Sequence, residues 1–211
     1  MGIRSFARHL SALLAMGAVC LLLAPAAWAG LPKIKLTAGS LSAFASPQVV
    51  QVVFVYDGLM VGDTPETTYV AEKVAEKNAE EAGKGDDWAQ RWASDRVGRF
   101  HPKFHELMNR ELEALQVTTA DAPASPTLIM TIRVKRIEPG FYSYMVNKPA
   151  EVDFDVSVAT AAAPGTEIAH LTLERAPGVS VVAMVDTGER ISEAYAKAGK
   201  ELAQYIAKNA K

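Results

Sequence analysis

The run EVDFDVSVA, at residues 151–159, alternates polar and apolar side chains. Successive side chains of a β-strand point to opposite faces, so this period predicts a strand with one face in the core and one toward solvent. The runs at 127–137 and 166–174 have a similar pattern and are separated from 151–159 by turn residues. We therefore predict that the three runs form an antiparallel meander.

A fourth apolar run, QVVQVVFVYDG at 48–58, is almost continuous in valine and phenylalanine. Such a run is typical of a strand that is buried on both faces and lies centrally in its sheet. It also indicates that the meander is joined by at least one more strand. The Asp57-Gly58 pair then predicts a turn.

The spacing of apolar residues predicts helices at 64–83, from Asp86 onward, at 102–116 and at 188–209. This order of elements predicts an α/β (α+β) domain with a mixed sheet and its main helices packed on one face. Gly199 lies on the apolar stripe of the last helix, where glycine costs about 1 kcal/mol relative to alanine. We take this as a sign of close approach to the sheet.

The N-terminus has the pattern of a secretory signal peptide. Arg4 and Arg8 precede an apolar run at 10–23, and Ala27-Trp28-Ala29 supplies small residues before a cleavage site. An uncleaved membrane anchor is the alternative, but the apolar run is shorter than the ~20 residues of a span. We expect cleavage before Gly30 and a periplasmic or secreted product.

Cys20 is the single cysteine of the chain, and it lies inside the apolar run of the leader. Val19 precedes it where a lipoprotein signal has a small residue, so we do not expect a lipid anchor at Cys20. We divide the chain into a signal peptide (1–29), an N-terminal arm (30–47) and one α/β domain (48–211). Without a cysteine after residue 29, this domain cannot depend on disulfides.

Charge argues against nucleic acid as a partner. The chain has 22 basic and 24 acidic residues, and removal of the leader would take away two arginines and no acid. A mildly acidic protein lacks the clustered positive charge that phosphate backbones require. No segment after the leader is apolar enough for a transmembrane span.

The stretch HPKFHE, at 101–106, holds the strongest candidate for a metal site, because two histidines at i and i+4 of a helix can share a metal. A residue before proline is disfavoured in the helical conformation, and proline favours the first helical position. We therefore predict that His101 lies outside the helix that carries His105. A zinc site needs three or four ligands, and His170 is the one other histidine after the leader. We expect no metal site.

Other catalytic motifs are absent from the sequence. The glycine-rich stretch at 82–88 lacks the spacing of a phosphate-binding loop. Ser180 lacks the second glycine of a nucleophile elbow. Glu151, Asp153 and Asp155 resemble a paired-acid site, but on an alternating strand they fit a solvated face. We assign no catalytic residue and no cofactor, although a site assembled from distant residues stays open.

The segment EPGFYSYMVNKP, at 138–149, is the most distinctive candidate surface, because prolines and a glycine bracket four large side chains. Tyrosine and methionine are common in recognition surfaces. The candidate binding residues are Phe141, Tyr142, Tyr144 and Met145. The alternative, that they cover one end of the sheet, is open; for Trp88 and Trp92 we favour core packing.

The motifs FHELMNRELEAL and AYAKAGKELAQYIAKN, in the predicted order of elements, resemble a group of bacterial envelope domains. This group includes the curli-secretion lipoprotein and the lipoprotein activators of penicillin-binding proteins. The stretch YVAEKVAEKNAEEAGKGDDWAQRWASDRVGRFHPKF is similar to uncharacterised secreted bacterial proteins. The resemblance covers residues 48–209 at the level of architecture and implies the fold without assigning a functional residue.

The sequence therefore predicts an exported, non-enzymatic cell-envelope protein that binds a protein or a glycan through Phe141–Met145. One alternative is a periplasmic metal-assisted hydrolase that uses His101, His105 and an acid. Another is a small-ligand carrier with a pocket between helices and sheet. The sequence leaves the oligomeric state open.

Overall fold

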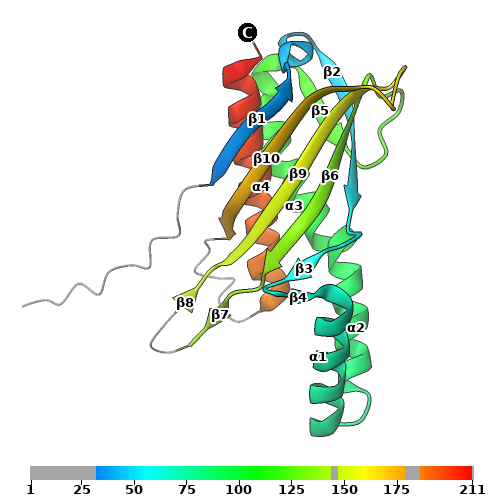
Figure 1. Cartoon of the computed structure of the whole chain (residues 1–211), viewed down its shortest axis with the longest axis vertical. Coiled ribbons are helices and arrows are strands. Elements are labelled where there is room, and N and C mark those ends of the chain that lie inside the picture. Colours follow the sequence, from blue (N-terminus) through cyan, green and yellow to red (C-terminus); the bar gives the residue numbers. More distant parts are fainter. Residues whose placement is uncertain (1–31, 144–146, 179–185, 211) are drawn as a thin grey trace, which may run out of the picture.

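The computed structural model describes residues 32–143, 147–178 and 186–210 (Figure 1). The predicted signal peptide, with its cleavage site and Cys20, lies outside these residues. None of the described helices combines the length and apolarity that a membrane span requires.

A mixed sheet forms one layer of the protein, and its main path runs β1-β10-β9-β6-β2-β5. Its strands are β1 (Lys33–Gly39), β2 (Gln48–Val55), β3 (Met60–Val61), β4 (Thr64–Pro65), β5 (Val117–Ala120), β6 (Leu128–Glu138), β9 (Ala150–Thr160) and β10 (Glu167–Gly178). The β6–β9–β10 pairs are antiparallel, as the predicted meander requires, whereas β2 pairs in parallel with β5 and β6. The predicted fold class is confirmed.

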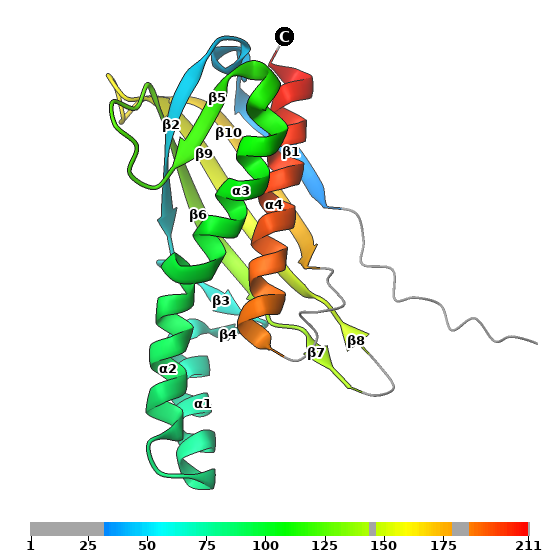
Figure 2. The same ribbon diagram turned by 180° about the vertical axis from the view of Figure 1, so that it is seen from behind.

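Two of the four described α-helices cover one face of this sheet. The α-helices of the described residues are α1 (Glu66–Glu80), α2 (Lys84–Asp95), α3 (His101–Leu112) and α4 (Thr187–Asn209). Figures 1 and 2 show α3 and α4 side by side across the same face, whereas α1 and α2 form a hairpin that projects beyond the end of the sheet. Asp186 caps α4, because its side chain accepts a hydrogen bond from the Glu189 backbone N–H.

The core lies between the meander and the two long helices. The inward residues of β9 are fully or almost fully buried: Val152, Phe154, Val156 and Val158. They are met by apolar side chains of the helices, among them Phe104, Met108, Leu112, Ile191, Leu202 and Ile206. The alternation seen in the sequence therefore marks the two faces of the sheet correctly.

The segment expected to be an N-terminal arm is part of the domain. β1 is an edge strand that pairs with β10, and Leu41 and Phe44, which follow it, have 1% and 0% of their surface exposed. Burial of these two side chains fixes the segment to the core. The boundary predicted at residue 47 is therefore replaced by one before β1.

Gly199 makes a close approach, but to α3 and not to the sheet as predicted. A Cβ atom at Gly199 would lie 2.4 Å from the Phe104 carbonyl oxygen. The two helix backbones can come this near because glycine has no side chain at the point of contact. The stripe of small residues on α4 therefore sets the spacing of the helix layer.

We expect Gly199→Ala to lower the free energy of unfolding by about 1–3 kcal/mol, because the added methyl group overpacks a contact between backbones. Gly98→Ala is the matched control, since a Cβ there meets nothing within 4 Å. Urea unfolding measures both variants. Equal stability of Gly199→Ala and the unchanged protein would contradict the close contact.

Candidate functional site

His101 lies within a continuous helix, which corrects the prediction that it precedes the helix. Its backbone angles are φ −60° and ψ −47°, and its N–H donates to the Arg96 carbonyl oxygen across a π-helical turn, Arg96–Phe100. This wider turn stands immediately before Pro102, where an ordinary helical turn would clash with the proline ring. His101 and His105 therefore share one face of α3.

Asp121, which follows β5, joins the two histidines. Its Oδ2 atom lies 2.9 Å from His101 Nδ1, and its Oδ1 atom lies 2.8 Å from His105 Nε2. The histidine side chains are largely buried, with 10% and 14% exposed, whereas that of Asp121 is 43% exposed. We call these three residues the Asp121 clasp, since they fasten the β5–β6 connection to α3.

The partners of His105 fix the orientation of its ring. Asn109 is oriented by two hydrogen bonds with the Thr119 backbone, so its Oδ1 faces the Thr119 hydroxyl at 2.9 Å. An amide oxygen only accepts, so the hydroxyl donates to Asn109 and has a lone pair left for His105 Nδ1, 2.8 Å away. Both ring nitrogens of His105 are therefore engaged, Nδ1 with Thr119 and Nε2 with Asp121.

His101 is held in its neutral form. The Tyr195 hydroxyl donates to the Tyr56 oxygen, and the Tyr56 hydroxyl lies 3.0 Å from His101 Nε2. Burial lowers the pKa of His101, although the hydrogen bond with Asp121 opposes this shift. A neutral His101 donates from Nδ1 to Asp121 and accepts from Tyr56 at Nε2.

The hydrogen bonds of the clasp favour the ionised form of Asp121. Burial alone would raise the pKa of this carboxyl group, but hydrogen bonds from His105 and His101 outweigh burial and lower the pKa. The cluster therefore holds an ionised carboxylate between two imidazole rings.

The order Tyr56–His101–Asp121 resembles a hydroxyl–imidazole–carboxylate relay. A nucleophile in such a relay requires an activated hydroxyl group. Burial instead raises the pKa of Tyr56 to about 12, so its hydroxyl keeps its proton and serves as a donor to His101. The geometry fits a structural clasp better than a nucleophilic site.

The histidines do not gather into a metal centre. No group of three or more His, Cys, Asp or Glu side chains in the described ranges is placed to hold a metal ion. In the clasp, every ring nitrogen already has a hydrogen-bond partner. His170 lies elsewhere, on β10, with its Nε2 2.6 Å from Asp155 Oδ1.

The predicted binding hairpin is present, as β7 (Phe141–Tyr142) and β8 (Asn147–Lys148). Phe141 and Tyr142 are 48% and 47% exposed, so about half of each side chain is accessible to solvent. Tyr144 and Met145 lie outside the described residues.

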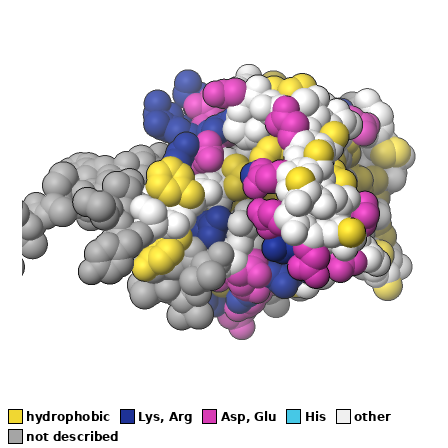
Figure 3. Space-filling view, turned by 90° about the horizontal axis from the view of Figure 1, so that it is seen from below, with side chains coloured by type: hydrophobic (Ala, Val, Ile, Leu, Met, Phe, Trp, Pro, Cys, Tyr) yellow, Lys and Arg dark blue, Asp and Glu magenta, His cyan; other side chains and the backbone are white. Residues whose placement is uncertain are grey.

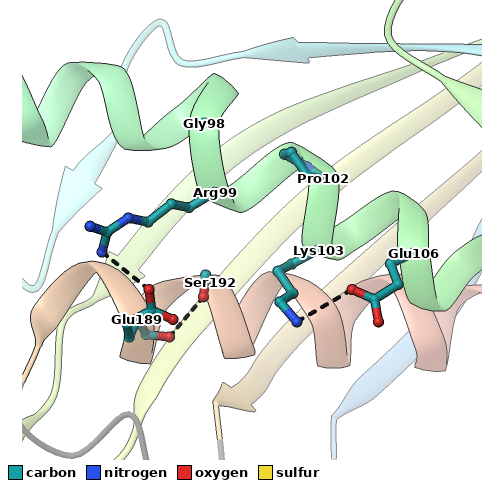
Figure 4. A pocket seen from close by; sticks show the side chains of 7 residues that line it. All are labelled: Gly98, Arg99, Pro102, Lys103, Glu106, Glu189 and Ser192. Carbon is teal, nitrogen blue, oxygen red and sulfur yellow. Dashed lines mark hydrogen bonds and ion pairs between the residues drawn. The ribbon is translucent and has the colours of Figure 1, made fainter.

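Two surface hollows accompany these clusters. The one in Figure 4, about 170 Å³, lies between α3 and α4, and its Arg99 and Lys103 pair with Glu189 and Glu106. The other, about 450 Å³, lies beside Tyr56. The guanidinium of Arg96 lies 3.9 Å from the centre of the Tyr56 ring and pairs with Glu66, which also accepts from Trp92. The arginines of both hollows are already engaged within the fold.

No family model matches the chain, and no curated protein matches it. The chain is similar to several solved structures, among them the following two. The PelC dodecamer protein from Paraburkholderia phytofirmans is 12% identical, with 82% of this chain and 98% of that chain covered and a TM-score of 0.37. Protein XCC0632 from Xanthomonas campestris, of family model DUF330, is 12% identical, with 82% and 91% covered and a TM-score of 0.31. These scores are too low to carry an argument.

Sequence reasoning found His101 and His105 but missed Asp121, Thr119 and Tyr56. Asp121 lies 16 residues beyond His105, directly after β5. No local pattern marks it as a partner of α3. Only the parallel pairing of β5 with β2 places it there.

We expect Asp121→Asn to lower the free energy of unfolding at pH 7 by about 1–2 kcal/mol. This value lies in the lower part of the range for hydrogen bonds to charged groups, because the Asp121 side chain is partly exposed. The folded-state pKa is lowered, so this contribution is present above the ordinary value of 3.8 and is lost as pH falls through the folded value. Urea unfolding from pH 7 to pH 3 measures it.

Asp63→Asn is the control for this variant, because Asp63 is exposed and should change stability by less than about 0.5 kcal/mol. A loss in Asp121→Asn that is equally large at pH 3 and pH 7 would contradict the role of an ionised Asp121.

Proposed function

We propose that this chain is an exported, non-enzymatic protein of the cell envelope that binds another protein or a glycan through the β7–β8 hairpin. The observation that carries the proposal is the exposure of Phe141 and Tyr142, two adjacent aromatic side chains that are each almost half exposed. Aromatic side chains that become buried in a complex are frequent centres of binding energy.

The base of the hairpin is fixed, which favours recognition. Lys148 Nζ lies 2.8 Å from Glu138 Oε2, and the Gly140 N–H donates to Glu138 Oε1. Arg190 of α4 donates to the Pro139 carbonyl oxygen at 3.2 Å. A fixed base lowers the conformational entropy that is lost when the hairpin binds a partner.

The rest of the chemistry also favours binding over catalysis. Every fully buried polar side-chain atom in the described residues has a hydrogen-bond partner. The Asp121 clasp uses its polar groups on one another and leaves no activated nucleophile. Figure 3, which views the end from which the α1–α2 hairpin projects, shows hydrophobic side chains interspersed with charged ones.

The metal-assisted hydrolase is the second hypothesis, because the structure brings His101, His105 and an acid together. A metal would have to displace the hydrogen bonds of the clasp. Metal analysis of the purified protein separates the two hypotheses. Stoichiometric zinc that disappears in His105→Ala would favour the hydrolase and contradict our proposal.

We expect the double variant Phe141→Ala/Tyr142→Ala to bind its envelope protein or glycan with an affinity at least about tenfold lower. The reason is that truncation of a central aromatic side chain commonly costs ~2 kcal/mol or more of binding free energy. Quantitative pulldown from envelope extract measures the retained fraction. The matched control is Val97→Ala, which alters a 69% exposed side chain on the π-helical turn.

Circular dichroism and urea unfolding establish that each variant is folded. A folded double variant that retains the same partners in the same amounts would rule out the hairpin as the contact surface.

A further inference from the structure

A pocket of about 270 Å³ lies where the α1–α2 hairpin meets the first turn of α4. Three stretches that are distant in sequence form it: residues 77, 88–99 and 186–188. Its volume is close to the lower end of the ~300–1,000 Å³ range of ligand pockets, which suits a small unit such as one sugar ring. It shares Arg99 with the hollow in Figure 4.

Two cations that line this pocket have no ion-pair partner among the described residues. They are Lys77 of α1 and Arg91 of α2, and neither makes a hydrogen bond through its side chain in the described residues. Neighbouring lysines on the same hairpin are paired, Lys73 with Glu76 and Lys84 with Glu80. Lys77 and Arg91 provide a place for a carboxylate, which arginine can bind through two parallel hydrogen bonds.

The indole rings of Trp88 and Trp92 form another part of the wall. Their centroids lie 5.5 Å apart in a stacked arrangement, and the Trp92 N–H is used by Glu66. The Trp88 N–H has no partner among the described residues. Trp88 therefore offers both an apolar ring and a free donor, the combination by which aromatic residues contact ligands that are partly apolar and partly polar.

The lining of the pocket also includes acceptors. Asp95 and Asp186 line it, and Arg99 holds both, at 3.1 Å and 3.3 Å. Gly188 lies so close that a Cβ atom there would be 2.3 Å from Asp95 Oδ2. These carboxylates are therefore fixed in place. They would repel a second negative charge but accept hydrogen bonds from hydroxyl groups.

We propose that this pocket binds a saccharide that carries a carboxylate, such as a uronic acid unit. The carboxylate lies at Lys77 and Arg91, the sugar ring contacts Trp88, and hydroxyl groups donate to Asp95 and Asp186. A neutral sugar would leave the two cations unused, and a phosphate dianion would meet the aspartates. The site is separate from the β7–β8 hairpin and does not depend on the function proposed for that surface.

Tryptophan fluorescence tests the proposal, because two of the three tryptophans of the chain, Trp88 and Trp92, line the pocket. The probe is tetragalacturonate, with its fully methyl-esterified form as the neutral counterpart. We expect a saturable change with the acid form and at least roughly tenfold weaker binding of the ester, the loss typical of one charged hydrogen bond.

The double variant Lys77→Ala/Arg91→Ala should weaken binding of the acid form by a similar factor. Lys73→Ala/Lys84→Ala is the matched control, since it removes the same number of cations from the same hairpin outside the pocket, and it should change the Kd by less than about twofold. Phe141→Ala/Tyr142→Ala should bind the probe unchanged, which separates this site from the hairpin surface.

Three results would overturn the proposal: no saturable change with tetragalacturonate, equal binding of the ester, or full binding by folded Lys77→Ala/Arg91→Ala. A loss of probe binding in Phe141→Ala/Tyr142→Ala would move the saccharide to the hairpin and would overturn it as well.

Discussion

The contact between α3 and α4 over the meander is the constraint on which the rest of the structure depends. The inward side chains of β9 are buried beneath these two helices, and the helices lie close together because Gly199 touches the Phe104 backbone. Apolar burial supplies the driving force, at about 25 cal/mol per Å², but the small residue decides how near the helices come. This spacing places His101 and His105 against the end of β5 and places the first turn of α4 beside α2.

The Asp121 clasp shows how a buried polar cluster can be satisfied without a metal or a substrate. Each ring nitrogen of the two histidines has one partner, and the donor and acceptor roles are consistent from Tyr195 through to Asn109. Such a network costs little when every member is paired, whereas a partly satisfied one would destabilise the fold. The cluster thus joins β2, α3 and the β5–β6 connection at the edge of the core.

The two proposed binding surfaces differ from the Asp121 clasp in one respect: they have apolar side chains or hydrogen-bond donors that remain available to a ligand. Phe141 and Tyr142 expose apolar area, and Lys77, Arg91 and Trp88 have donors without partners among the described residues. Both surfaces also have a fixed base, at Glu138 in the hairpin and at Arg99 in the pocket. A binding site requires side chains that are available to the ligand and are held in place by a rigid fold.

The clearest error of sequence reasoning concerns His101. The rule that a residue before proline avoids the helical conformation is a statistical preference, and here His101 is helical within a continuous helix whose π-helical turn lies before Pro102. Similarly, the small-residue composition of 30–47 suggested a loose arm, because composition does not reveal that Leu41 and Phe44 reach the core. Gly199 was correctly predicted to make a close contact, but the predicted partner, the sheet, was wrong, because the contact is with α3.

The sequence by itself determined the elements of this protein, because period-two and helical spacing of apolar residues depend only on neighbours along the chain. It therefore defined the meander, the long helices and the side chains that face the core. The tertiary structure alone decided which distant polar groups meet. Asp121 reaches α3 only through the pairing of β5, and Lys77, Arg91 and Asp186 share a pocket only because the α1–α2 hairpin and the first turn of α4 converge.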